Sequence, residues 1–202
     1  MLSQIAEYSW LEKRELILGS QSPRRAELLR GLGLHFLQYA IPGLDESYPK
    51  DLPAEEVAAF LSRKKAETYR PDLKPNNILL TSDTTVVLDG EILDKTSDPE
   101  QALDNLRRLS GRSHTVITGL SICDRERIWT ASDSATVHVA ALSESELRYY
   151  LQHYAPYDKA GSYGIQEWLG YRGISRIDGS FFTIMGLPTH LVIEGLLHFR
   201  PK

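Results

Sequence analysis

Two neighbouring arginines at the start of an expected helix are the first residues that could do chemistry. Ser22 is a good N-cap and Pro23 suits the first helical position, so Arg24 and Arg25 fall in the first turn. That turn favours Asp or Glu by about 0.3–1 kcal/mol each, because it carries the positive end of the helix dipole. A bound anion would offset two cations placed there. Alternatively, both arginines are solvated and pair with acids such as Glu27.

Asp83 is a second candidate, because it directly follows an apolar strand. If Asp89-Gly90 makes a two-residue hairpin turn, residue 84 pairs with residue 95, which makes Thr84 and Lys95 cross-strand neighbours. Asp83 beside this lysine is either a surface ion pair worth about 0.5 kcal/mol or a base or metal ligand next to a phosphate-binding lysine. Its position at a strand end favours the second interpretation.

Two further segments carry groups suited to a charged ligand. Glu46, in the acidic loop that starts at Asp45, could join Asp83 in holding Mg²⁺ together with substrate phosphates, although a solvated acidic loop is the commoner explanation. Residues 158–166 combine glycines with Lys159, which can meet an anion, and Gln166, which can read a base edge. This second segment could equally be a glycine-rich packing turn.

Several common motifs are missing from the chain. The six histidines show no metal-binding spacing, and neither a P-loop nor a dinucleotide-binding glycine motif is present. His114 could help a site, or it could be a hydrogen-bonding residue at the start of a strand. Kinase, Ras-like and dinucleotide-cofactor functions therefore lose their usual support.

Composition describes an ordinary globular protein. The chain has 202 residues, 42% of them hydrophobic and 25% charged, and its net charge of −4 argues against a general nucleic-acid-binding surface. The single cysteine, Cys123, excludes an intramolecular disulfide and fits a cytoplasmic location, and its apolar run indicates a packed strand residue. No run approaches membrane-spanning length, and the first residues do not form a secretory signal, so no membrane partner is expected.

Alternating strand and helix patterns predict the α/β elements that must position these groups. No linker is visible, so we expect an N-terminal extension over residues 1–15 and one domain over residues 16–202. Strands are expected at 16–18, 35–40, from 78–80 continued by 85–88, and at 91–93, 115–123 and 129–140, with late strand material at Ile177 and 181–184. Helices are expected from Pro23, over 53–69, from Pro99 to Gly111, after the Ser143/Glu146 capping box, and from Pro188.

The ordered set of segments resembles the Maf family of nucleoside triphosphate pyrophosphatases. The matching segments lie at 20–25, 45–46, 65–66, 82–84, 95, 109–116, 158–166 and 186–188. The resemblance therefore extends over nearly the whole chain, from Leu16 to Leu197. Two positions depart from the family pattern, which usually has Ala where this chain has Ser82 and Pro where it has Thr96.

The resemblance implies a mixed α/β sheet, elongated and flanked by helices, with two lobes around a deep nucleotide-binding cleft, frequently in a homodimer. It also implies Mg²⁺- or Mn²⁺-assisted hydrolysis of dTTP and UTP to the monophosphate and pyrophosphate. Thr84 after Asp83 argues against the subgroup acting on 7-methyl-GTP, which usually has Gln there. Asp83 becomes the proton acceptor, and Arg24, Thr84 and Gln166 become substrate-selecting residues.

The predicted site follows from these two lines of reasoning. Catalytic roles are assigned to Asp83, Glu46 and Lys95, with Glu46 and Asp83 as metal ligands. Substrate binding is assigned to Ser20, Arg24, Arg25, Lys65, Thr84, Lys159 and Gln166. A second hypothesis, suggested by the family's association with septum formation, is a regulatory protein that senses a nucleotide without turnover.

Overall fold

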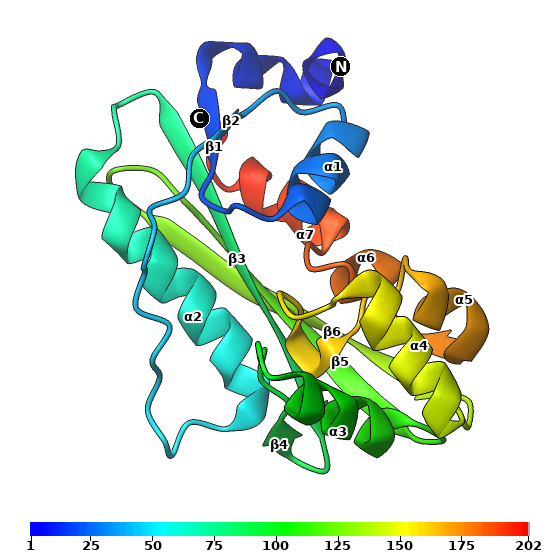
Figure 1. The fold of residues 1–202 in the computed structure, drawn as a ribbon. Coiled ribbons are helices and arrows are strands. Elements are labelled where there is room, and N and C mark those ends of the chain that lie inside the picture. Colours follow the sequence, from blue (N-terminus) through cyan, green and yellow to red (C-terminus); the bar gives the residue numbers. More distant parts are fainter. Residues whose placement is uncertain (202) are drawn as a thin grey trace. The chain divides into compact units, whose positions relative to one another are not determined.

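Seven strands of the chain form one mixed sheet. The computed structural model describes residues 1–201, so Lys202, the last residue of the expected domain, lies outside the described part. The strand order is β2-β1-β3-β5-β6-β7, with β4 paired to β3 (Figure 1). β1 runs parallel to β2 and β3, whereas the β3–β4 and β6–β7 pairs are antiparallel. This arrangement confirms the predicted mixed α/β sheet with flanking helices.

The elements follow one another in alternating order. The strands are β1 (Glu15–Leu18), β2 (Leu37–Gln38), β3 (Asn77–Leu88), β4 (Glu91–Ile92), β5 (Ser113–Cys123), β6 (Ile128–Val139) and β7 (Ile174–Asp178). The α-helices are α1 (Pro23–Gly31), α2 (Ala54–Tyr69), α3 (Pro99–Leu109), α4 (Glu144–Tyr154), α5 (Trp168–Gly173), α6 (Phe181–Ile184) and α7 (Thr189–Leu197). The short 3₁₀ helices are η1 (Leu2–Gln4), η2 (Ala6–Lys13), η3 (Arg70–Asp72) and η4 (Ala160–Ser162).

The chain divides into two compact units. The first unit comprises Met1–Asp83, Thr118–Asp133 and Gly186–Lys202, and the second comprises Thr84–Ile117 and Ser134–Met185. β3, β5 and β6 each contribute residues to both units. Among residues 1–201, no helix is long and apolar enough to span a membrane.

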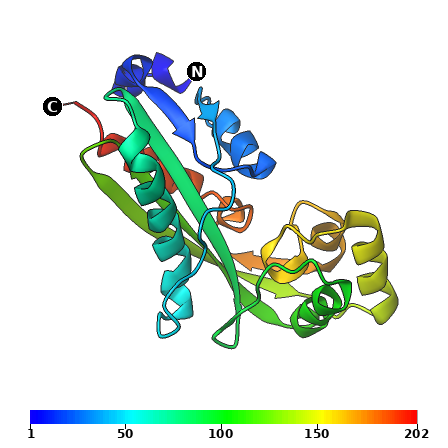
Figure 2. The same cartoon turned by 60° about the vertical axis from the view of Figure 1, so that its left-hand side comes forward.

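In the first unit, helices cover both faces of the strands. α2 lies along one face and α1 and α7 lie over the other, as Figure 2 shows from a second direction. Successive strand residues alternate between these layers: Leu16 and Leu18 belong to the core cluster shared with α1 and α7, while Ile17 packs with the cluster that contains the end of α2. Leu11 of η2 is buried in the first of these clusters, so the N-terminal segment packs onto this unit.

The second unit gathers the remaining helices around the other strand segments. α3 and α4 lie side by side (Figure 2). α3 begins with an Asp98 cap that accepts the Glu100 N–H, and α4 begins with the predicted Ser143/Glu146 capping box. The predicted Asp89-Gly90 hairpin is also formed, with Leu88 opposite Glu91.

Three predicted strands differ from the structure. The strand expected over 35–40 shrinks to Leu37–Gln38, which pair with Ile17 and Leu18. On its C-terminal side it stops because β1 ends at Leu18. The return strand of the hairpin, expected over 91–93, ends at Ile92 as β4. The predicted ladder therefore does not extend to a strand pair between Thr84 and Lys95. Residues 181–184 form helix α6, because Gly179 with φ of 126° turns the chain after β7 and Ser180 begins a helix.

Candidate active site

A buried ammonium group joins the two carboxylates that were predicted as metal ligands. Lys65 Nζ lies 2.5 Å from Asp83 Oδ1 and 2.7 Å from Glu46 Oε1. The side chains of Lys65 and Asp83 are 10% and 8% exposed, whereas that of Glu46 is 51% exposed. The cluster therefore has a buried pair and one carboxylate that faces solvent.

The strand and the helix that carry the buried pair face each other inside the first unit. Asp83 lies on β3 beyond the end of β1, whose last residue, Leu18, pairs with Leu80. Lys65 lies on the α2 face that packs against β3, where Ser62 O accepts the Thr81 hydroxyl at 2.8 Å. The helical spacing predicted for α2 thus turns Lys65 toward the sheet.

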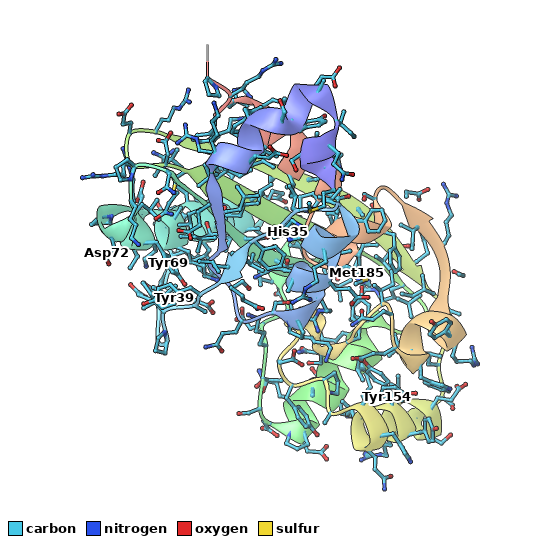
Figure 3. All side chains as sticks on the ribbon, turned by 90° about the horizontal axis from the view of Figure 1, so that it is seen from above. His35, Tyr39, Tyr69, Asp72, Tyr154 and Met185 are labelled. Atoms are coloured by element: carbon cyan, nitrogen blue, oxygen red, sulfur yellow. The ribbon has the colours of Figure 1, made fainter. Side chains whose placement is uncertain are left out.

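The loop that carries Glu46 is held at several points. Tyr69, at the end of α2, accepts the Ile41 N–H at 2.7 Å, and its ring packs edge-on against Tyr39 (Figure 3). On either side of Glu46, Lys64 Nζ binds Asp45 Oδ2 and Ser47 O, both at 2.7 Å. The Lys64 ammonium and the Ser47 N–H, which donates to Asp45 Oδ1 at 2.8 Å, hold the pKa of the Asp45 carboxyl well below its usual range. The two acids of this loop therefore have different partners: Asp45 binds Lys64, and Glu46 binds Lys65.

Arg25 is anchored by the backbone and by Ser20. Its Nε donates to Gly186 O at 2.8 Å and its Nη1 donates to Ser20 Oγ at 3.2 Å. Burial lowers the pKa of the Arg25 guanidinium, and the charges of Asp83 and Glu46 oppose this shift. Arg25 and Ser20 therefore belong with the carboxylate cluster, and the interpretation of both arginines as solvated is wrong for Arg25.

The arginine helix begins as predicted. Ser22 Oγ accepts the Arg25 N–H at 3.4 Å and Pro23 occupies the first turn. Arg24 is half-buried in the same turn. The anion-binding role of this helix start remains a prediction.

Ser82 links the same backbone carbonyl to the sheet. Its hydroxyl lies 2.8 Å from Gly119 O and 3.1 Å from Gly186 O, and it is almost fully buried. The single hydroxyl proton of Ser82 can go to either carbonyl, and Gly186 O also accepts the Arg25 Nε–H. The departure of this chain from the usual alanine adds a hydrogen-bond donor next to Asp83.

In the second unit, the glycine-rich segment places a lysine beside a carboxylate that was not predicted. Lys159 Nζ lies 2.8 Å from Asp158 Oδ1 and 3.1 Å from Glu167 Oε1, and its side chain is 10% exposed. Gln166 is half-buried in the turn that precedes Glu167. Tyr150 donates a short hydrogen bond to Glu167, so this segment is tied to α4.

The other two predicted residues of the second unit are Thr84 and Lys95, which belong to the hairpin region of the chain. Thr84 is half-buried on β3, immediately after Asp83, and Lys95 is exposed beyond the end of β4. Their roles remain predictions.

Two buried residues, His114 and Cys123, are held inside the protein. His114 Nε2 lies 2.7 Å from the Tyr163 hydroxyl near the start of β5, and burial lowers the pKa of His114 to about 4. Cys123 is fully buried on β5, and burial raises the pKa of its thiol to about 12.

The oxygen donors of the cluster suit a hard divalent cation. Glu46 and Asp83 already hold one cation between them, the Lys65 ammonium, and Mg²⁺ sites commonly combine one or two carboxylates with substrate phosphates. Among residues 1–201, no three His, Cys, Asp or Glu side chains gather as a metal site. Two carboxylates would leave the other coordination positions of such a cation to phosphate oxygens.

The residues missed by sequence reasoning are those that hold predicted ones in place. Gly186 O, Ser82, Tyr150 and Glu167 all act through contacts between distant segments. Signals existed for Ser82, whose departure from the resembled family was visible, and for Gly186, which lies in the matching segment 186–188.

Together, a mixed α/β sheet and a cluster of cations and carboxylates beyond the end of a parallel strand define an α/β protein with a charged site at the carboxyl end of a strand. The family model described as Maf-like protein matches residues 15–199. The chain therefore belongs to the Maf family.

Curated relatives match over most of their length. A Porphyromonas gingivalis protein named dTTP/UTP pyrophosphatase is 50% identical over 191 residues, which cover 94% of this chain and 96% of the relative. A Bacteroides thetaiotaomicron protein with the same name is 47% identical, over 88% of this chain and 92% of the relative. Among solved structures, a HAM1 protein from Coxiella burnetii is 17% identical with a TM-score of 0.40, covering 64% of this chain and 74% of that chain.

Proposed function

We propose that this protein is a nucleoside triphosphate pyrophosphatase that hydrolyses dTTP and UTP to the monophosphate and pyrophosphate. The observation that carries the proposal is the Glu46–Lys65–Asp83 cluster beside the anchored Arg25. Family membership and relatives named dTTP/UTP pyrophosphatase at up to 50% identity support the substrate.

The residues of the first unit are assigned to the phosphate chain. Asp83 accepts a proton from the water that attacks the α-phosphorus, the bond to the β-phosphate breaks, and pyrophosphate leaves. Arg24 and Arg25 bind phosphate oxygens, with Ser20 holding the Arg25 guanidinium. A divalent cation such as Mg²⁺ or Mn²⁺, held by Glu46 and Asp83, would neutralise charge on the phosphates.

The residues of the second unit are assigned to the base and to further phosphate contacts. Gln166 and Thr84 bind the two carbonyls and the N3–H of uracil or thymine. The glutamine amide offers a donor and an acceptor, and the threonine hydroxyl can donate or accept. Lys159 and Lys95 bind phosphate oxygens as point charges.

A nucleotide sensor without turnover is the second candidate function. A sensor has no need for a buried carboxylate that can activate water, whereas this chain keeps Asp83 paired with Lys65. The presence of that pair favours the enzyme. We also propose that the protein is a cytoplasmic homodimer. Light scattering from the purified protein would measure the mass of the dimer.

A substrate panel tests the function. Purified protein is assayed for pyrophosphate release from dTTP, UTP and 7-methyl-GTP with Mg²⁺, with Mn²⁺, and with a chelator. We expect turnover of dTTP and UTP in the presence of a metal and much less of 7-methyl-GTP. Binding of dTTP without pyrophosphate release under all metal conditions would instead support the sensor.

The substitution Asp83→Asn tests the catalytic assignment. We expect a loss of about 10²–10⁴-fold in kcat, because an amide cannot accept the proton from water. Asp89→Asn is the matched control, since Asp89 is exposed at the hairpin turn and pairs with Arg112. Unchanged turnover in Asp83→Asn would remove Asp83 from the catalytic role.

A further inference from the structure

We propose that Lys64 is a positioning residue that holds the loop carrying Glu46 against α2 and thereby raises the affinity of the site for its divalent cation. The inference rests on the proposed function, because it concerns the cation assigned to Glu46 and Asp83. Lys64 contacts neither the cation nor the nucleotide in this proposal, and it acts only through the residues on either side of Glu46.

The loop between β2 and α2 carries Glu46 on irregular backbone. Residues 39–53 form neither helix nor strand, and the loop runs alongside α2 in both ribbon views (Figure 1 and Figure 2). The Glu46 side chain is 51% exposed. A carboxylate on such a loop loses conformational freedom when it binds a cation, so contacts that fix the loop beforehand favour binding.

Lys64 ties both neighbours of Glu46 to the helix. Its Nζ lies 2.7 Å from Asp45 Oδ2, 2.7 Å from Ser47 O and 3.0 Å from Ser47 Oγ, and an ammonium has three donors for these three oxygens. Asp45 Oδ1 also accepts the Ser47 N–H at 2.8 Å, so the two neighbours are bound to each other. One side chain of α2 therefore fixes the backbone before and after Glu46.

The Glu46 carboxylate is held in turn by the next residue of the helix. Glu46 Oε1 lies 2.7 Å from Lys65 Nζ, which also lies 2.5 Å from Asp83 Oδ1. Successive residues of an α-helix are about 100° apart around its axis, so Lys64 and Lys65 point to different sides. Lys65 marks the place where the two carboxylates already share a positive charge, and Lys64 keeps Glu46 within reach of that place.

The charge of Lys64 by itself would act in the opposite direction. An ammonium near a bound divalent cation repels it, so removal of the charge alone should strengthen cation binding. Loss of a positioning contact should instead weaken binding, because Glu46 must then be ordered at the moment when the cation binds. The sign of the change in affinity therefore separates positioning from charge.

Lys64→Met tests the inference, because it removes the ammonium and keeps a long unbranched side chain. Mn²⁺ is titrated into the protein with a non-hydrolysable dTTP analogue, and free Mn²⁺ is measured by electron paramagnetic resonance. We expect the Mn²⁺ dissociation constant to rise about fivefold, near the upper limit for the loss of a solvent-accessible ion pair. Arg63→Met is the matched control, since Arg63 forms an exposed pair with Glu67 of the same helix, and it should not raise this constant.

Two further measurements separate loop order from catalysis. In hydrogen exchange without metal or nucleotide, peptides covering residues 44–52 should exchange faster in Lys64→Met than in the wild-type protein or in Arg63→Met. In pyrophosphate release from dTTP, Lys64→Met should need more Mn²⁺ but keep the wild-type kcat at saturating Mn²⁺, because Lys64 touches no reacting group.

The outcomes distinguish this inference from the proposed function. A Mn²⁺ dissociation constant in Lys64→Met that equals the wild-type value or lies below it would overturn the inference, and so would equal rises in Lys64→Met and Arg63→Met. Wild-type turnover of dTTP would leave the proposed function standing in both cases. A wild-type protein that neither binds Mn²⁺ with the analogue nor hydrolyses dTTP would overturn the proposed function, and this inference with it.

Discussion

The Lys65 ammonium holds the carboxylate cluster together. It neutralises a carboxylate, Asp83, that is only 8% exposed, and it does so from a helix whose other residues on this face pack against the sheet. Neighbouring Lys64 forms the same kind of pair with Asp45, but there the side chains are 29% and 68% exposed. The two adjacent lysines therefore offer a direct comparison of a buried pair with a solvated one.

Lys65→Met should destabilise the protein far more than Lys64→Met. Removing one partner of a buried ion pair leaves a desolvated charge, and we expect a loss of about 3 kcal/mol in the free energy of unfolding. Removing the exposed pair should cost at most about 1 kcal/mol. Urea unfolding of both variants measures the difference, and equal losses would mean that water solvates the Asp83 carboxylate.

Helix α2 is brought onto the sheet by a glycine. A Cβ atom at Gly119 of β5 would lie 2.2–2.5 Å from the Ala58 and Ala59 backbone, so the helix backbone rests directly on this strand. Gly119 O also accepts the Ser82 hydroxyl. The depth at which α2 sits on the sheet, and with it the reach of Lys65 to Asp83, depends on this absence of a side chain.

Gly119→Ala should therefore push α2 outward. We expect a loss of about 1–3 kcal/mol in stability from overpacking, together with lower activity because Lys65 shifts away from Asp83. Gly31→Ala is the control, since a Cβ atom at this helix end meets no atom within 4 Å. Thermal unfolding and pyrophosphate release measure both variants, and wild-type behaviour of Gly119→Ala would show that the α2 backbone can yield at no cost.

The stability of the complete fold should depend on pH through His114. Burial lowers the pKa of this imidazole from its ordinary value of 6.5 to about 4, so the unfolded chain binds a proton more readily than the folded one. The stabilisation is fully present above pH 6.5 and is lost as the pH falls from 6.5 toward 4. The total is about 3 kcal/mol.

Urea unfolding at several pH values between 4 and 7 measures this loss. His114→Gln should show a flatter pH dependence across that window than the wild-type protein, because an amide does not titrate. His153→Gln, at an exposed histidine, should keep the wild-type slope. An unchanged slope in His114→Gln would assign the acid sensitivity to other groups.

Local signals in the sequence predicted much of the fold. The Ser22 and Asp98 caps, the Ser143/Glu146 capping box and the Asp89-Gly90 turn all appear where expected, because each depends on residues within a few positions of one another. Predictions failed where a long-range partner decided the outcome. The strand expected over 35–40 keeps only Leu37 and Gln38, which pair with Ile17 and Leu18 of β1. Residues 181–184 are a separate, local case, because the turn at Gly179 directly precedes helix α6.

The candidate site divides in the same way. The residue types suited to phosphate and metal could be recognised along the chain, because charge and donor chemistry belong to single residues and the family's segments keep their order. Which residues pair could not be predicted. Lys65 meets Asp83, Gly186 O meets both Arg25 and Ser82, and Tyr150 meets Glu167 only after folding brings distant segments within hydrogen-bond distance. Such pairings depend on how helices pack on the sheet, which no short stretch of sequence encodes.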